Sequence, residues 1–411
     1  EPLDMDLAAT RNSPLTYRDT FLPNEQVWIA IDPAVQPPYV GLMADVYVVH
    51  HRTEAQWVLN TNLVEVGDGV ETIHLRHVCV NCWPTKIWEP PLTPGEYDVV
   101  IDRDRDGHYN SGVDIIDSLD PVGFTVSEIR VDSISFNYPG SGVITIYDDA
   151  AGANITPPEY SSAASAPIKP AAWVRGGTRS VKVEFTAVSG ISSAQIWAVN
   201  GLGGLTKSGT PQVTFTGNHG QGVFNVNTMP SAVGKHLFAW DWKYTVASTT
   251  KPIGRTGQHL VYTVLQNPIP PPAPIQPMPT PWLKLLDHAC TWGSGSTTKE
   301  QVCTNLLNNG FSGHYTWNMD CHRLSSDFVR LISTQGITGS AHRWASVGCG
   351  AVDYMAYQRT KAIDPVGPTW GYGMIDWYWH QWAEAQGKQR DPSAAVSLSG
   401  NWGAYEDDLF F

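Results

Sequence analysis

Residues 320–336 read DCHRLSSDFVRLISTQG, and this stretch decides how the last third of the chain is interpreted. Apolar residues recur in it at helical spacing, at Leu324, Phe328, Leu331 and Ile332. Gly336 follows the last of them, and glycine is common where a helix ends because it tolerates a positive φ angle. The pattern therefore predicts a helix that begins near Cys321 and ends before Gly336.

The start of a helix is a reactive position for a cysteine. The positive end of the helix dipole and the unpaired backbone N–H groups there favour the thiolate over the thiol. The thiolate is the nucleophilic form, so Cys321 is a candidate nucleophile. The alternative is that Cys321 is held in a disulfide, as many cysteines of secreted proteins are.

A second stretch supplies the partners that such a thiol needs. Residues 375–393 read IDWYWHQWAEAQGKQRDPS, an aromatic run followed by a Gly-Lys turn and a short polar return. This pattern predicts a β-hairpin with His380 and Asp391 on neighbouring strands. The carboxylate would then hold the imidazole in one tautomer, and the imidazole would activate the thiol of Cys321.

Other residues compete for these two roles. The histidines that compete with His380 are His288, His314, His322 and His342. His322 adjoins Cys321, so on a helix its side chain diverges from the thiol. Asp376 and Glu384 compete with Asp391, but we expect both on the same strand as His380, where they do not reach across to the imidazole.

Together, Asp320-Cys321 at a helix start, the run LISTQGITGSAHRW and the run WHQWAEAQGKQRDPS resemble the transglutaminase-like superfamily of papain-fold cysteine enzymes. The resemblance covers residues 282–411 and implies an α+β fold with a cysteine helix packed on a sheet. It implies Cys321 as the nucleophile, His380 as the base and Asp391 as the residue that orients the base. The superfamily includes proteases, amidases, deamidases and inactive members, so hydrolysis and transamidation both remain open.

The composition is typical of extracellular β-rich proteins. Only 16% of the 411 residues are charged, while Gly, Pro and Trp are abundant. There are 26 basic and 39 acidic residues, and the net charge of −13 argues against nucleic acid as a partner. No apolar run is long enough to span a membrane. We therefore expect an extracellular, periplasmic or cell-surface protein.

The pattern along the chain predicts several domains. Residues 1–127 and 128–266 contain short alternating strands separated by Gly and Pro, which predicts two all-β immunoglobulin-like sandwiches. Residues 267–281 contain dense prolines and predict a stiff polyproline II spacer. The expected fold class is therefore multidomain, with the two sandwiches followed by the α+β transglutaminase-like domain of residues 282–411.

An acidic loop lies in the first predicted sandwich. Residues 102–114 read DRDRDGHYNSGVD, and acidic side chains at alternate positions before Gly can surround Ca²⁺ with oxygen atoms. The predicted ligands are Asp102, Asp104, Asp106, the carbonyl of His108, and Asp114 or Asp117. Val113 stands where an EF-hand requires Glu, so this is not an ordinary EF-hand. The alternative is a solvated acidic turn; in both cases the expected role is structural, with no cofactor for catalysis.

The remaining cysteines leave the disulfide pattern open. Cys79 and Cys82 are close enough for a local disulfide. If Cys321 is a thiol, we expect one pair among Cys290, Cys303 and Cys349, with one thiol left over. The rival prediction, in which all four C-terminal cysteines are bridged, removes the nucleophile.

Two functions follow from these patterns. The first is a secreted cysteine acyl-transfer enzyme that acts on amide bonds of a protein or peptide substrate, by cross-linking or by proteolysis or deamidation. The alternative is a structural or adhesive surface protein, with an inactive transglutaminase-like module, that assembles into oligomers or fibres. A third function, calcium-dependent carbohydrate binding through exposed Trp residues, depends on composition alone.

Overall fold

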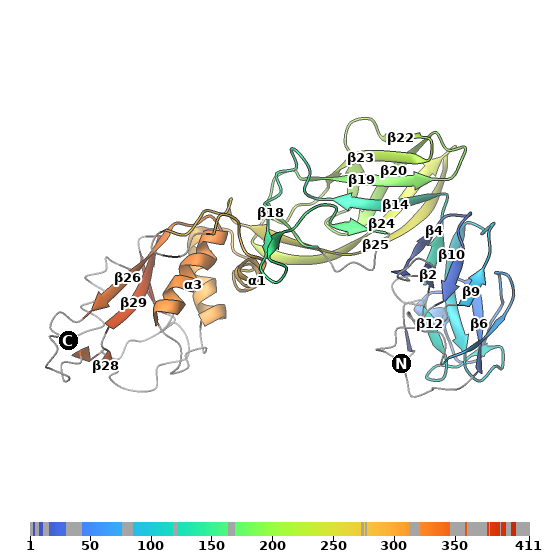
Figure 1. Ribbon diagram of the computed structural model, residues 1–411, viewed down its shortest axis with the longest axis horizontal. Helices are drawn as coiled ribbons and strands as arrows, with labels where there is room; N and C mark the ends of the chain where they lie inside the picture. Colours follow the sequence, from blue (N-terminus) through green and yellow to red (C-terminus); the bar gives the residue numbers. More distant parts are fainter. Residues whose placement is uncertain are drawn as a thin grey trace.

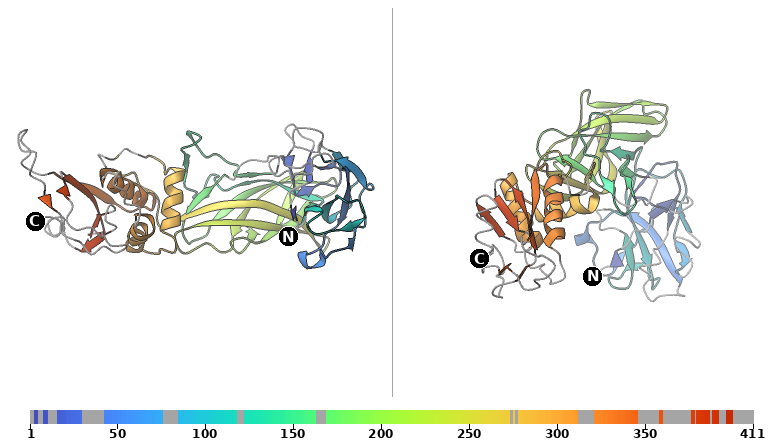
Figure 2. Two further views of the ribbon diagram at one scale, coloured as in Figure 1. Left: turned by 90° about the horizontal axis from the view of Figure 1, so that it is seen from below. Right: turned by 60° about the vertical axis from the view of Figure 1, so that its left-hand side comes forward.

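The chain is built mostly from β-strands in three units that follow one another in a row (Figure 1). The computed structural model describes residues 3–4, 8–10, 16–29, 43–75, 85–117, 122–162, 169–272, 275, 278–311, 321–345, 358–359, 376–377, 379–386, 388–391 and 396–399. The N-terminal unit and the helical C-terminal unit lie at opposite ends of the row (Figure 2). The prediction of a multidomain, β-rich protein is therefore confirmed.

The N-terminal unit consists of two larger sheets around one core. Its elements are β1 (Leu3–Asp4), β2 (Ala8–Thr10), β3 (Thr16–Tyr17), β4 (Thr20–Phe21), β5 (Val27–Ile29), β6 (Met43–His50), η2 (Glu54–Gln56), β7 (Thr61–Asn62), β8 (Glu71–His74), β9 (Thr85–Trp88), β10 (Gly95–Asp102), β11 (His108–Tyr109), β12 (Ile115–Asp117) and β13 (Phe124–Val126). One sheet contains β1, β12, β10, β13, β4, β6 and β8, and the other contains β3, β2, β5 and β9. Buried residues of both sheets, among them Ile29 and Val99, belong to the same hydrophobic cluster.

The middle unit contains one connected set of ten paired strands. Its strands are β14 (Ile129–Ser135), β15 (Tyr147–Asp148), β16 (Ala153–Asn154), β17 (Tyr160–Ser161), β18 (Ala171–Val174), β19 (Ser180–Ala187), β20 (Ser193–Asn200), β21 (Leu205–Lys207), β22 (Gln212–Thr216), β23 (His219–Val226), β24 (Gly234–Val246) and β25 (Thr249–Val264). The pairing order is β17-β14-β19-β23-β21-β20-β24-β25-β18, with β22 beside β20 and β23. In β19 every second residue is buried, as its alternating sequence requires.

The C-terminal unit places three helices beside a four-stranded sheet. Its elements are α1 (Leu283–Trp292), α2 (Lys299–Leu306), η3 (Leu307–Phe311), α3 (Cys321–Thr334), β26 (Gly339–Ala345), β27 (Gln358–Arg359), β28 (Asp376–Trp377), β29 (Trp379–Ala385), β30 (Lys388–Asp391) and β31 (Val396–Ser399). The sheet order is β26-β29-β30-β31, and α3 packs against β26 and β29. Among the described residues, no helix combines the length and apolar character that a membrane-spanning helix needs.

The helix α3 starts and stops where its sequence predicts. It begins at Cys321, and after Thr334 the chain turns through Gly336, whose φ angle is +70°. The N–H of Ile337 donates to the carbonyl of Ile332 and the N–H of Gly336 donates to that of Ser333. These two bonds form a Schellman motif, which satisfies carbonyl groups that the end of a helix leaves unpaired.

One hydrophobic cluster joins the C-terminal unit to the middle unit. It combines Phe328 and Ile332 of α3 with Cys290 of α1 and with Tyr262 and Val264 of β25, and each of these side chains is almost completely buried. The helices therefore pack directly on the end of the long β24–β25 hairpin.

The proline-rich segment between the two units is not the spacer that its composition predicts. Ile275 and Met278 are buried, and Ile275 belongs to the same cluster as α3. The N–H of Ile269 also donates to the carbonyl of Ser333, 3.0 Å away. A spacer would keep its side chains in solvent, whereas this segment contributes apolar side chains to the shared core.

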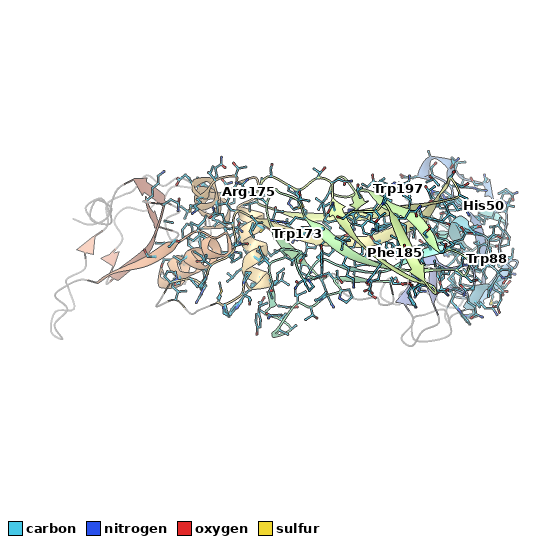
Figure 3. The ribbon with its side chains drawn as sticks, turned by 90° about the horizontal axis from the view of Figure 1, so that it is seen from above. His50, Trp88, Trp173, Arg175, Phe185 and Trp197 are labelled. Atoms are coloured by element: carbon cyan, nitrogen blue, oxygen red, sulfur yellow. The ribbon has the colours of Figure 1, made fainter. Side chains whose placement is uncertain are left out.

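Polar contacts reinforce both junctions between the units. Arg175, labelled in Figure 3, follows β18 and donates to the carbonyl of Thr297, 2.7 Å away, just before α2. At the other junction Arg130 of β14 forms an ion pair with Glu25 of the N-terminal unit. The three units are therefore connected by specific contacts as well as by the chain.

Replacing Gly336 by Ala tests the end of α3 and its close contact with Asn267, at the start of the proline-rich segment. The positive φ angle alone should cost about 1–2 kcal/mol of unfolding free energy. A further loss is expected because an added Cβ would lie 2.5 Å from the carbonyl oxygen of Asn267. Urea unfolding measures the total loss of unfolding free energy. Gly295→Ala is the control, because Gly295 has a φ of +79° and an added Cβ there would meet no atom within 4 Å. Equal losses of unfolding free energy for the two variants would show that the contact with Asn267 contributes nothing.

Candidate functional site

The start of α3 and the end of β26 lie at the same end of the C-terminal unit. Only residues 335–338 connect the end of α3 to the start of β26, so the strand runs back along the helix. The 14 residues of α3 span about 20 Å, close to the length of β26. The backbone of Cys321 is therefore roughly level with that of Trp344, near the end of β26.

The backbone pairing brings His380 to the same end of the sheet. Strands β26 and β29 are antiparallel, and Trp344 pairs with His380. Because α3 packs against both strands, Cys321, the first residue of α3, and His380, the second residue of β29, lie near the starts of two neighbouring elements. Two of the three predicted site residues are thus at corresponding ends of the helix and the sheet, as Figure 1 shows for α3, β26 and β29.

Asp391 lies on the strand next to His380, on the hairpin that the sequence predicts. The pair Ala383↔Arg390 sets the register between β29 and β30. Continued by one residue, this register places position 391 opposite position 382. Position 380 is two residues from position 382 on the same strand. Positions 380 and 391 are then diagonal neighbours across the two strands, about 7–8 Å apart. The side chains of Cys321, His380 and Asp391 lie outside the described part of the structure.

One competitor for the role of Asp391 is placed differently from the prediction. Asp376 belongs to β28, which pairs with β27 in a separate two-stranded sheet, and not to the strand that carries His380. Glu384 does lie on β29, where it pairs with Ser340 and Gln389. The sequence pattern missed this break because an aromatic run does not show where one strand ends and the next begins.

The cysteines of the helical unit differ from the expected pattern. Cys290 and Cys303 are both completely buried, and both are thiols and not half-cystines. Any pair among Cys290, Cys303 and Cys349 would include one of them, so that predicted disulfide is wrong. The rival prediction, with all four cysteines bridged, is wrong for the same reason. Cys79, Cys82 and Cys349 lie outside the described residues.

Cys290 is held in the core as an unreactive thiol. Its Sγ donates to the carbonyl of Thr263 at 3.6 Å and accepts from the Gln335 side chain at 3.5 Å. Burial raises the pKa of the Cys290 thiol to about 12. A thiol with this pKa has almost no thiolate at neutral pH and is not a nucleophile.

We expect iodoacetamide to leave Cys290 unmodified in the native protein at about pH 8, because burial excludes both the reagent and the thiolate form. After unfolding in guanidinium chloride the same residue should be fully alkylated. Mass spectrometry of the peptide that contains Cys290 measures the modified fraction. Equal alkylation in the native and unfolded states would contradict the buried position.

The acidic loop brings three of its predicted ligands together. One carboxylate oxygen from each of Asp102, Asp104 and Asp106 lies within 4.8 Å of the other two. Asp102 is completely buried at the end of β10, while Asp104 and Asp106 are exposed. Burial and the nearby Asp104 carboxylate raise the pKa of Asp102 against the hydrogen bond from Gly107. The arrangement suits Ca²⁺, because this ion takes carboxylate oxygens as ligands and flexible loops can bring them to within about 2.3–2.6 Å of it.

The other predicted ligands are outside this group of three carboxylates. The carboxylate of Asp114 accepts hydrogen bonds from the backbone N–H groups of Arg103 at 2.9 Å and Asn110 at 2.6 Å. Burial raises its pKa to about 6. Asp117 pairs with Val99 on β10, three residues before Asp102, which is about 10 Å along the strand. The N–H of His108 donates to Asp106 at 2.8 Å, so its backbone does lie beside the cluster.

A pocket beside α3 was not anticipated from the sequence. Its volume is about 470 Å³, and it lies between α1, η3 and α3. From α1 it is lined by Leu285, His288 and Trp292, which recur at helical spacing and form one face of that helix. This spacing was a detectable signal, but the sequence does not show that α3 leaves space beside that face.

A buried carboxylate in the N-terminal unit was also missed. Asp98 is completely buried, and it contacts Nδ1 of His51 at 2.8 Å and accepts from the N–H of Arg52 at 2.9 Å and Nε1 of Trp57 at 3.2 Å. Burial raises the pKa of Asp98, and the hydrogen bonds from His51 and Arg52 oppose the shift. These three partners lie within residues 51–57, the segment that follows β6 and contains η2, so the contacts hold this segment against β10.

Comparisons with known proteins do not identify a family. No protein-family model and no curated protein matches this chain. Among solved structures, the crystal structure of a protein of unknown function from Porphyromonas gingivalis W83 covers 60% of this chain and 94% of its own. The two are 9% identical, with a TM-score of 0.15.

Proposed function

We propose that the protein is a cysteine acyl-transfer enzyme that acts on amide bonds of proteins or peptides. The observation that carries the proposal is the position of Cys321 at the first residue of a 14-residue helix, level with the His380 backbone pair. Helix packing against the strand of His380 supports the same assignment. We also propose that this C-terminal unit has a papain-like fold and that the two β-units are immunoglobulin-like sandwiches.

The proposed reaction uses one residue for each step. His380 takes the proton of the Cys321 thiol, and the thiolate attacks the carbonyl carbon of the amide. His380 then gives the proton to the leaving amine as the C–N bond breaks, which leaves a thioester on Cys321. Water or a second amine attacks this thioester, and the thiol is restored. Asp391 orients the imidazole and stabilises its charged form.

The helix position assists the thiolate. Backbone N–H groups in the first turn of α3 are not used by the helix itself, and the helix dipole adds partial positive charge there. Both favour a thiolate at the start of a helix, whereas Cys290 is a buried thiol inside α1. Two thiols in one small unit would thus have opposite reactivity because of where each lies on its helix.

Cys321→Ala is expected to reduce amide chemistry to background, a loss of about 1000-fold or more, because the nucleophile is removed. His380→Ala and Asp391→Asn should each lower kcat by about 100-fold or more. Two assays on the full chain are needed: incorporation of hydroxylamine into a glutamine peptide, and cleavage of casein.

The matched control is Cys303→Ala, which removes a buried thiol from α2 and should retain activity if the protein folds. Circular dichroism confirms folding of each variant. Absence of any Cys321-dependent reaction in either assay would contradict the enzyme and favour a structural or adhesive surface protein. The specific contacts between the three units make that second function reasonable, since they would hold an extended array in one shape.

We also propose that the acidic loop binds Ca²⁺ through Asp102, Asp104 and Asp106. Hard oxygen ligands from an alternating acidic run fit this ion, and Gly107, with a φ of +77°, allows the sharp turn that follows Asp106. The role is structural, because the loop belongs to the unit farthest from α3 (Figure 2). The bound ion would neutralise the mutual repulsion of the three carboxylates.

Millimolar Ca²⁺ is expected to stabilise the N-terminal unit, by about 2.7 kcal/mol at a concentration 100 times the dissociation constant. Asp104→Asn should weaken Ca²⁺ binding by about tenfold or more, because it removes one charged ligand. Glu71→Gln is the control, an exposed carboxylate of the same unit on β8. Isothermal calorimetry measures the affinity, and equal binding by wild type and Asp104→Asn would contradict the site.

A further inference from the structure

The pocket beside α3 has no part in the chemistry proposed above. Its volume of about 470 Å³ is within the range of sites that hold small ligands or single side chains. On α3 it is lined by Leu324, Asp327 and Leu331, which lie three and seven residues apart along one face of the helix. This face begins one turn after Cys321.

The inner part of the pocket is apolar and closely packed. Leu324, Leu331 and Phe311 are buried in the core that α3 shares with α1. The ring of Trp292 is covered by the His288 ring, stacked at 4.6 Å, and Gly310 packs so closely that an added Cβ would lie 2.3 Å from it. Since the His288 ring already stacks on Trp292, the pocket suits an inserted apolar side chain better than a sugar ring that needs an open stacking surface.

The rim of the pocket is polar and carries both signs of charge. Arg330 forms an ion pair with Asp327 at 2.9 Å, and the carboxylate of Asp149 accepts from the backbone N–H of Lys284 at 3.3 Å. This balance does not favour a strongly charged ligand. It does provide donors and acceptors for the amide groups of a peptide backbone around an apolar interior.

We propose that this pocket binds an aromatic or large aliphatic side chain of the peptide substrate, beside the amide that Cys321 attacks. The inference rests on the proposed function for its substrate class. Leu324 is about 4.5 Å along the helix axis from Cys321, and helical side chains lean toward the N-terminus. A peptide advances about 3.3–3.6 Å per residue, so an anchor in the pocket lies one to three residues from the reacting amide.

Direct binding tests the pocket without turnover. The protein is the full chain with Cys321→Ala, and the probes are a fluorescein-labelled peptide amide of sequence GFGQG and its counterpart GAGQG. Fluorescence anisotropy should show about tenfold tighter binding of the phenylalanine peptide, because its ring leaves water. Equal affinities for the two peptides would overturn the proposal.

Two variants of α1 locate the binding. Leu285→Glu places a charge in the pocket wall and should abolish the preference for the phenylalanine peptide. Leu283→Glu is the matched control, because both leucines are half-buried on α1 against the same core and only Leu285 lines the pocket. A preference that survives Leu285→Glu, or that both variants lose equally while folded, overturns the assignment.

Kinetics with the wild-type cysteine separate the pocket from the chemistry. Leu285→Glu should raise KM for the phenylalanine peptide by about tenfold with kcat unchanged, since the pocket binds ground state and transition state alike. If no peptide is turned over but the anisotropy preference is present and depends on Leu285, the pocket is supported and only the proposed enzyme fails. If turnover depends on Cys321 but shows no preference for phenylalanine, the enzyme stands and the pocket proposal fails.

Discussion

The hydrophobic core shared by α1, α3 and the end of β25 is the constraint on which the helical unit depends. Phe328 and Ile332 pack in one cluster with Tyr262 and Val264 of the middle unit. Burying each large apolar side chain contributes about 1.5–3 kcal/mol, so the helices cannot leave the hairpin without a large loss of stability. The direction of α3, and hence the position of its first residue, Cys321, is therefore set by the neighbouring β-unit.

A polar contact inside this core makes the packing specific. The side chain of Gln335 is completely buried, and its amide oxygen accepts from the N–H of Leu265 at 3.0 Å. Its amide nitrogen donates to the sulfur of Cys290 at 3.5 Å. Buried polar groups need such partners, so a shift of α1 or α3 relative to β25 would leave some of them unpaired. Cys290 thus has a structural role that requires a protonated thiol.

The same rigidity bears on the proposed chemistry. A nucleophile and a base must be held within a fraction of an ångström of their productive positions, and groups on helices and strands are held better than groups on loops. Cys321 starts a helix that is anchored along its length, and His380 lies on a strand paired with β26. The acidic loop belongs to the N-terminal unit, at the other end of the row of units (Figure 2).

Local sequence patterns were sufficient where the structure depends on neighbouring residues. The start of α3 at Cys321, its end before Gly336, the β29–β30 hairpin and the cluster of Asp102, Asp104 and Asp106 all follow from periodicity and turn chemistry. Only the tertiary structure decided that Cys290 is a buried thiol, that the proline-rich segment is part of a core, and that a pocket lies beside α3. Cys290 and its partner Gln335 are 45 residues apart, and no local pattern records which distant side chains pack together.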